Sequence, residues 1–209
     1  MIDVVLNLPS VNLGNYNNMK FFNSKELKIV GSILLFISII SFFNFRVSIR
    51  RARDAQRKND LGSLQEALER YHNYTGNYPL NSKDGRILSC IGPDTFFNEK
   101  TKIWENIRAC DWGMDNLYDF SDLDNPVFIE PIPTDPKQTE GIMFKYLSNG
   151  QRFQLLGYLE GEDEAEFDEL IQVRNINCGN KICNYGRSSG STPLDKSIDE
   201  YENELLDKK

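Results

Sequence analysis

The longest apolar stretch of the chain lies near its N-terminus. From Ile29 to Phe45 the sequence reads IVGSILLFISIISFFNF, with no charged residue. A helix rises about 1.5 Å per residue, so this run spans roughly 26 Å, close to the ~30 Å hydrocarbon core of a bilayer. The aliphatic stems of the flanking Lys28 and Arg46 can reach the interface. The pattern predicts a single membrane-spanning helix over residues 29–45. A buried core helix and a cleaved secretory signal are the alternatives.

A polar segment that favours helix follows the apolar run. Residues 46–71 contain no proline, and only Gly62 is a weak helix breaker. Four apolar side chains recur at spacings of three, four and three, which places them on one helical face. We therefore predict one long helix from about residue 25 to residue 71, which ends where turn residues accumulate. The four apolar positions are Leu61, Leu64, Leu68 and Tyr71.

Three further patterns follow in a fixed order. The helix ends in ARDAQRKNDLGSLQEALERYHNYTGNYP (52–79), a proline–aspartate–proline turn follows at 132–136, and a hairpin-like pattern runs over 144–155. Over roughly residues 22–161 this layout resembles a type IV pilin or a type II secretion pseudopilin. The resemblance implies an α+β fold, in which a long N-terminal transmembrane helix packs on a small antiparallel β-sheet head with disulfide-stapled loops. It implies a structural filament subunit, major or minor. The alternative is a non-polymerising single-pass membrane protein whose pilin-like head serves interaction or adhesion.

The resemblance also implies a processing site near the start of the helix. In that family a basic leader ends in glycine, before an aromatic first mature residue and a glutamate at the fifth position. Counting back from Glu26 makes Phe22 the first mature residue, but Phe21 stands where glycine is expected. The implied partners are a prepilin peptidase, the lipid membrane and other pilin subunits. Glu26 would set the axial register of the filament by pairing with the N-terminal amine of the neighbouring subunit, which cleavage frees. The alternative is that Glu26 pairs only with Lys25 or Lys28.

The expected domain organisation follows from these patterns. The antiparallel sheet is expected to use strands over 141–147, 152–159 and 170–177. The predicted parts are a leader-like or cytoplasmic segment (1–21), the long helix (22–72) and an extracytoplasmic head (73–183) with a loop region (73–140) and a sheet (141–177). The last part is a mobile charged tail (184–209), with a short surface helix in it as the alternative.

Charge divides the chain in the same way. The protein has 24 basic and 31 acidic residues, a net charge of −7, yet residues 1–60 alone carry nine basic and four acidic ones. Residues 61–209 therefore carry a net charge of −12, which disfavours direct binding of nucleic acid. By the positive-inside rule, the basic residues after the span favour a cytoplasmic C-terminal side. The cysteines and the resemblance favour an external head on the inner or cytoplasmic membrane, or in a cell-surface filament. The arginines would then bind lipid headgroups or neighbouring acidic heads.

Four cysteines are the next candidate site: Cys90, Cys110, Cys178 and Cys183. An even number in an acidic external head predicts two disulfides, and loop closure favours the sequential pairing, Cys90 with Cys110 and Cys178 with Cys183. A zinc site is the alternative, but the spacings do not fit two zinc knuckles. Only one histidine, His72, is present, and no nucleophile or phosphate-binding motif occurs, so we expect no catalytic site and no cofactor.

Two acidic runs raise calcium as an alternative to a solvated acidic surface. Calcium needs six to eight converging oxygens, and pseudopilins carry a calcium site in a C-terminal loop. No EF-hand pattern is present, so a solvated surface is the main expectation. The residues are Asp115, Asp119, Asp122 and Asp124 in the first run, and Glu160, Glu162, Asp163, Glu164, Glu166, Asp168 and Glu169 in the second.

Overall fold

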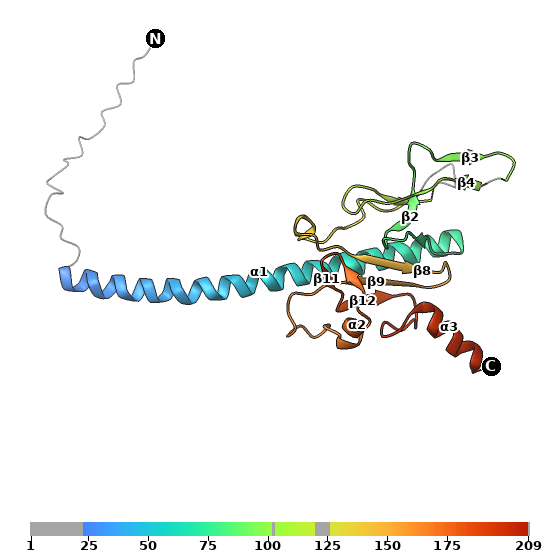
Figure 1. The fold of residues 1–209 in the computed structure, drawn as a ribbon. Coiled ribbons are helices and arrows are strands. Elements are labelled where there is room, and N and C mark those ends of the chain that lie inside the picture. Colours follow the sequence, from blue (N-terminus) through green and yellow to red (C-terminus); the bar gives the residue numbers. More distant parts are fainter. Residues whose placement is uncertain (1–22, 102, 120–125, 209) are drawn as a thin grey trace, which may run out of the picture. The chain divides into compact units, whose positions relative to one another are not determined.

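The protein was analysed as a computed structural model that describes residues 23–101, 103–119 and 126–208. The chain divides into two compact units, Met1–Val47 and Ser48–Lys209. The helix α1, Ser24–Thr75, contributes residues to both. The fold is therefore a long N-terminal helix followed by small antiparallel sheets, an α+β arrangement as predicted (Figure 1).

Local sequence explains both ends of α1. At its start, the Glu26 carboxylate accepts a hydrogen bond from the Asn23 backbone N–H at 2.8 Å, as in a capping box. At its end, Gly76 has a φ of +85°, a conformation that glycine adopts at no steric cost, and its N–H donates to the His72 carbonyl. The helix thus runs three residues beyond the predicted end at residue 72.

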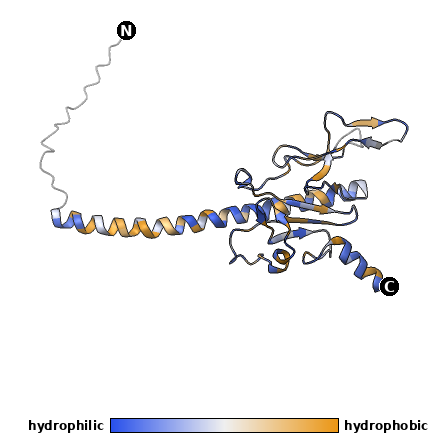
Figure 2. Ribbon diagram, in the orientation of Figure 1, coloured by the Kyte–Doolittle hydropathy of each residue, from blue (hydrophilic) through white to orange (hydrophobic). Residues whose placement is uncertain are grey.

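Burial along α1 changes from one unit to the other. Large apolar side chains from Leu27 to Ile49 are all exposed, by 38% to 65%. In the second unit the face carrying Leu61, Leu64 and Leu68 is completely buried, as the spacing predicted. Figure 2 shows the matching change in hydropathy, from apolar turns to mostly hydrophilic ones along α1.

The main sheet of the second unit has three antiparallel strands in the order β12-β9-β8. The hairpin of β8 (Lys145–Ser148) and β9 (Phe153–Gly157) falls where the sequence predicted it. Every residue of the central strand β9 is buried, which explains why no clean alternation marks it. The third strand, β12, is Tyr185–Ser188.

Two predictions for the C-terminal part were wrong. Residues 170–177 do not form the third strand; they overlap the short helix α2 (Glu169–Val173), which Asp168 caps by accepting from the Leu170 N–H. The described residues 184–208 are not a mobile tail, because they supply β12 and the helix α3 (Ile198–Asp207); α3 agrees with the alternative of a short surface helix.

Close packing explains why the glycine and serine run of this segment is ordered. A Cβ atom on Gly186 would lie 2.7 Å from the Leu155 carbonyl oxygen, so glycine allows the close approach of β12 to β9. The Ser189 hydroxyl accepts from the Phe153 N–H at 3.0 Å. Glycine and serine serve packing here, and the composition was misread as flexibility.

In its described residues, the predicted loop region 73–140 contains seven short strands. They form a three-stranded sheet, β1-β2-β5, and two separate hairpins, β3-β4 and β6-β7. Their bounds are β1 Leu80–Asn81, β2 Ile87–Cys90, β3 Phe96–Asn98, β4 Ile103–Glu105, β5 Arg108–Ala109, β6 Leu117–Tyr118 and β7 Val127–Ile129. A single 3-10 turn, η2 (Gln138–Glu140), precedes β8, and a small hairpin pairs β10 (Asn177–Cys178) with β11 (Lys181–Ile182).

Each disulfide lies in a hydrophobic cluster. The structure bonds Cys90 to Cys110 and Cys178 to Cys183, the sequential pairing that loop closure favoured. The first pair belongs to the main core with the α1 leucines and β9 side chains, and the second belongs to a smaller cluster with Leu156. All four cysteines are used, so no thiol remains for zinc.

Candidate functional site

The exposed apolar part of α1 is the first candidate site. Within the described residues, one helix near the N-terminus is long and apolar enough to span a membrane. Glu26 lies in its first turn and is exposed. Its carboxylate accepts a hydrogen bond from the Asn23 N–H, and among the described residues it forms no ion pair with Lys25 or Lys28. The candidate processing site, Phe21 and Phe22, lies outside the described residues.

Most basic residues that follow the apolar run bind acidic partners in their own chain, whereas Arg46 lies over the Phe42 ring. Arg53 binds both carboxylate oxygens of Glu160 at 2.6 Å, and Lys58 binds Glu164 and Glu166 at 2.9 Å each. Arg50 and Arg51 both pair with Asp163. Within the chain, the acidic loop after β9 therefore neutralises these side chains. Binding of the arginines to lipid headgroups or to neighbouring acidic heads stays a prediction.

Arg57 lies at the centre of this charge network. Its guanidinium is completely buried and donates to Asp54 and Glu160 at 2.8 Å, and to both oxygens of Asp135 at 2.8 and 3.0 Å. Burial alone would lower the pKa of Arg57, but its hydrogen bonds to Asp135 and Glu160 raise it above the ordinary value. The cation is therefore permanent, and it holds three separate segments together.

The carboxylates of the network are also satisfied. Asp54 accepts from the backbone N–H groups of Glu160 and Gly161 at 2.9 and 3.0 Å. The hydrogen bonds that Arg53 donates lower the pKa of Glu160 to about 2; burial opposes this shift, and the Arg57 hydrogen bond adds to it. Because the donors of Arg57 and the acceptors of its three carboxylates are matched, these groups join the loop after β9 to α1.

The acidic runs do not form a metal centre in the part of the chain that is described. Asp115 of the first run accepts two hydrogen bonds from Arg108, at 2.7 and 2.8 Å. In the second run the carboxylates of Glu160 to Glu166 mostly face arginine and lysine. No group of three potential ligands converges among residues 23–101, 103–119 and 126–208. Asp122 and Asp124 lie outside the described residues.

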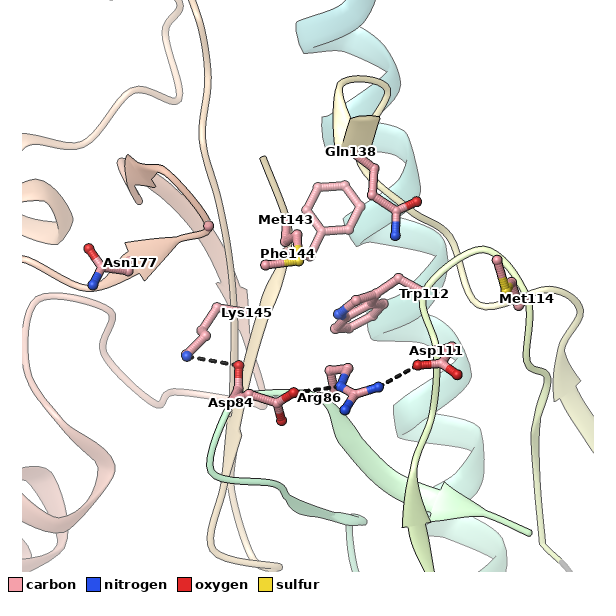
Figure 3. Close-up of a pocket in the computed structure, with 11 residues that line it drawn as sticks. Asp84, Arg86, Asp111, Trp112, Met114, Gln138, Met143, Phe144, Lys145 and Asn177 are labelled. Atoms are coloured by element: carbon pink, nitrogen blue, oxygen red, sulfur yellow. Dashed lines mark hydrogen bonds and ion pairs between the residues drawn. The ribbon is translucent and has the colours of Figure 1, made fainter. Parts of the chain in front are cut away.

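A cleft on the second unit is the site that sequence reasoning missed. It has a volume of about 570 Å³ and collects residues from four stretches of chain: 84–86, 111–114, 138–145 and 177–179. In Figure 3, Trp112 lies near the middle of these side chains, with Gln138 and Met114 around it. Arg86 donates to Asp84 and to Asp111, while the Lys145 ammonium donates to the Asp84 carbonyl at 2.9 Å. No local motif marks these positions, because only the fold brings them together.

Comparisons with known proteins found no match. The chain matches no protein-family model, no curated protein and no solved structure.

Proposed function

We propose that this protein is a structural subunit, a pilin or pseudopilin, of a type IV pilus or type II secretion-like filament. In this proposal α1 anchors the subunit in the membrane and later packs against other subunits. The supporting observation is the division of α1: residues 27–49 expose large apolar side chains, whereas residues 54–68 carry the buried face of a disulfide-bonded head.

The exposed apolar residues need an environment other than water. Removing apolar surface from water contributes about 25 cal/mol per Å², and monomeric soluble proteins rarely expose a long contiguous apolar patch. A lipid bilayer satisfies this requirement for a single subunit. Identical helices packed side by side in a filament satisfy it outside the membrane. Both environments suit the length and composition of this part of α1.

The disulfides support an external location for the head. Structural disulfides persist in oxidising compartments and are rare in the cytosol. Both pairs are buried in hydrophobic clusters, which is typical of structural bonds rather than exchanging ones. We infer a single-pass protein of the inner or cytoplasmic membrane with an extracytoplasmic head.

The processing site tests the polymerising proposal. Mass spectrometry of the protein purified from native membranes should find a mature N-terminus at Phe22 carrying a methyl group. A Phe21→Gly variant should be cleaved at least as completely, because glycine is the residue expected before the cut. An intact segment through Phe21 in the wild-type protein would contradict the polymerising function.

A second candidate function is a non-polymerising membrane protein with a pilin-like head for interaction or adhesion. The phenylalanine at position 21, and a cleft on the head that filament packing does not require, favour it. Sheared surface filaments labelled with an antibody to the head separate the two functions. Label along the filaments supports the subunit, and label confined to membranes supports the anchored protein.

A further inference from the structure

Trp112 places an unused hydrogen-bond donor in the cleft. The side chain is 5% exposed, and its indole N–H makes no hydrogen bond with any other described residue. In the described part of the chain, only Arg50 Nε is both fully enclosed and without a hydrogen-bond partner, so Trp112 Nε1 is not sealed off from the cleft. Figure 3 shows the nitrogen edge of the indole turned toward the space beside Lys145. Buried tryptophans usually pair this donor, so the cleft offers it to a ligand.

The charged groups around Trp112 balance one another. Asp84 and Asp111 face Arg86 and Lys145, and the Arg86 guanidinium is already held between the two carboxylates. An anionic ligand would meet both carboxylates and would have to displace them from Arg86. A cationic ligand would compete with Arg86 and Lys145. The arrangement therefore favours a ligand without net charge.

The ligand must nevertheless be polar. Each carboxylate can accept more hydrogen bonds than the ion pairs use, and the exposed amides of Gln138 and Asn177 make none with other described residues. A purely apolar ligand would leave these groups and the indole N–H unpaired. Hydroxyl groups match them well, because each hydroxyl can donate to a carboxylate and accept from an amide or indole N–H.

The cleft also has an apolar part. Met114 is 82% exposed and Met143 is 42% exposed, and the Trp112 ring meets Phe144 edge to face, with centroids 6.1 Å apart. Small-molecule sites combine such apolar walls with a few placed polar groups, in volumes of roughly 300 to 1,000 Å³. The 570 Å³ cleft lies within this range.

We propose that this cleft binds a neutral carbohydrate, either a free sugar or the terminal sugar of a glycan. A sugar ring carries hydroxyl groups around its rim and C–H groups on its faces, so it matches both the polar and the apolar parts of the cleft. The site is independent of membrane anchoring and of polymerisation, and the head would use it for recognition.

Tryptophan fluorescence tests the proposal directly. The protein has two tryptophans, Trp104 and Trp112, so a Trp104→Phe variant reports on the cleft alone. The full chain is kept in phosphocholine micelles, because maltoside or glucoside detergents would themselves offer sugars. The probes are glucose, galactose, mannose, N-acetylglucosamine, N-acetylgalactosamine and their β-linked disaccharides. At least one is expected to change the fluorescence saturably.

Variants in the same background locate the binding. Asp111→Asn should weaken the affinity at least tenfold, and so should Gln138→Leu, which removes an exposed side chain without hydrogen bonds and should leave the thermal midpoint unchanged. Asp207→Asn, at the far end of α3, is the matched control and should bind like the parent. The proposal is overturned if no sugar gives a saturable change in the folded protein. It also fails if the two cleft variants bind like the control, or if phosphate or glycylglycine saturates the signal while no sugar does.

Discussion

Arg57 of α1 and Asp135, which follows β7, form a two-pronged ion pair in which both side chains are completely buried. The distances are 2.8 Å from Nε to Oδ2 and 3.0 Å from the second guanidinium nitrogen to Oδ1. The two residues are 78 positions apart, and Asp54 and Glu160 complete the shell of the same guanidinium. The pair therefore fixes where the head sits on the C-terminal part of α1.

Removing the arginine should strongly destabilise the head. Arg57→Gln leaves three carboxylates close together without their shared cation, and breaking a buried pair in this way costs ~3 to 5 kcal/mol. We expect a loss of this size in the free energy of unfolding of the full chain in micelles, followed by near-UV circular dichroism in urea. Arg51→Gln is the control, because Arg51 is 63% exposed and its pair with Asp163 should contribute less than ~1 kcal/mol. Equal effects of the two variants would contradict the role given to the buried pair.

Protonation of Glu160 should destabilise the folded protein in acid. The pKa of this group is lowered to about 2 in the folded protein, below its ordinary value of about 4.5. A lowered carboxyl pKa contributes stability that is fully present above the unfolded value and is lost as the pH falls toward the folded one. We therefore expect the Glu160 contribution to decline between pH 4.5 and pH 2. Glu160→Gln should be less stable at pH 7 and should show a shallower decline over that window.

A nearby exposed carboxylate provides the control for that experiment. Glu162 lies two residues away, is exposed and makes no ion pair with other described residues. Glu162→Gln should leave the pH dependence as in the parent protein. A flat profile in the parent between pH 4.5 and pH 2 would show that the Arg53 and Arg57 contacts do not act on Glu160 as described.

The two disulfides should contribute unequally. The Cys90–Cys110 bond closes a separation of 20 residues and the Cys178–Cys183 bond one of 5. In the chain-entropy model, closing these loops stabilises the folded protein by about 3 and about 2 kcal/mol, respectively. Replacing each pair by alanine and measuring urea unfolding should show the larger loss for Cys90 and Cys110. The reverse order would mean that local packing, rather than loop closure, dominates.

Two variants of Glu26 distinguish a helix-capping role from a role in filament assembly. Glu26→Gln keeps an oxygen that can accept from the Asn23 N–H, whereas Glu26→Leu removes it. If Glu26 sets subunit register through its charge, both variants should reduce the amount of subunit recovered in sheared filaments. If it only caps the helix, Glu26→Gln should assemble normally. Glu66→Gln, on an exposed part of the same helix, is the control and should assemble like the parent.

The close approach of β12 to β9 predicts that substitution of Gly186 destabilises the protein. An alanine Cβ at Gly186 would lie 2.7 Å from the Leu155 carbonyl oxygen and 2.8 Å from a Leu156 methyl group. Gly186→Ala should cost ~1 to 3 kcal/mol of stability, because the strands must move apart. Gly62→Ala is the comparison: its nearest neighbour would be 3.8 Å away, and alanine favours a helix interior, so stability should be unchanged or higher.

Local sequence patterns predicted the elements that depend on nearby residues. The apolar run, the Leu61, Leu64 and Leu68 spacing and the absence of proline specify α1, because helix formation depends on contacts three and four residues apart. The β8–β9 hairpin and the sequential disulfides were also predicted, since each joins residues close in the chain. The helix end was missed by three residues, because Asn73, Tyr74 and Thr75 continue the last turn and Gly76 ends it.

Only the tertiary structure decided which distant groups meet. Tyr185–Ser188 is a strand because β9 offers it an unpaired edge, and no feature of a glycine and serine run reveals that edge beforehand. Arg50, Arg51 and Arg53 pair with a loop more than 100 residues away, which their charge alone did not reveal. The cleft around Trp112 likewise exists only once four stretches of chain are folded together. The sequence by itself determined the helix, the hairpin and the disulfide pairing, because local hydrogen bonds and short loops set them, whereas long-range packing decided the sheet's third strand, the charge partners and the cleft.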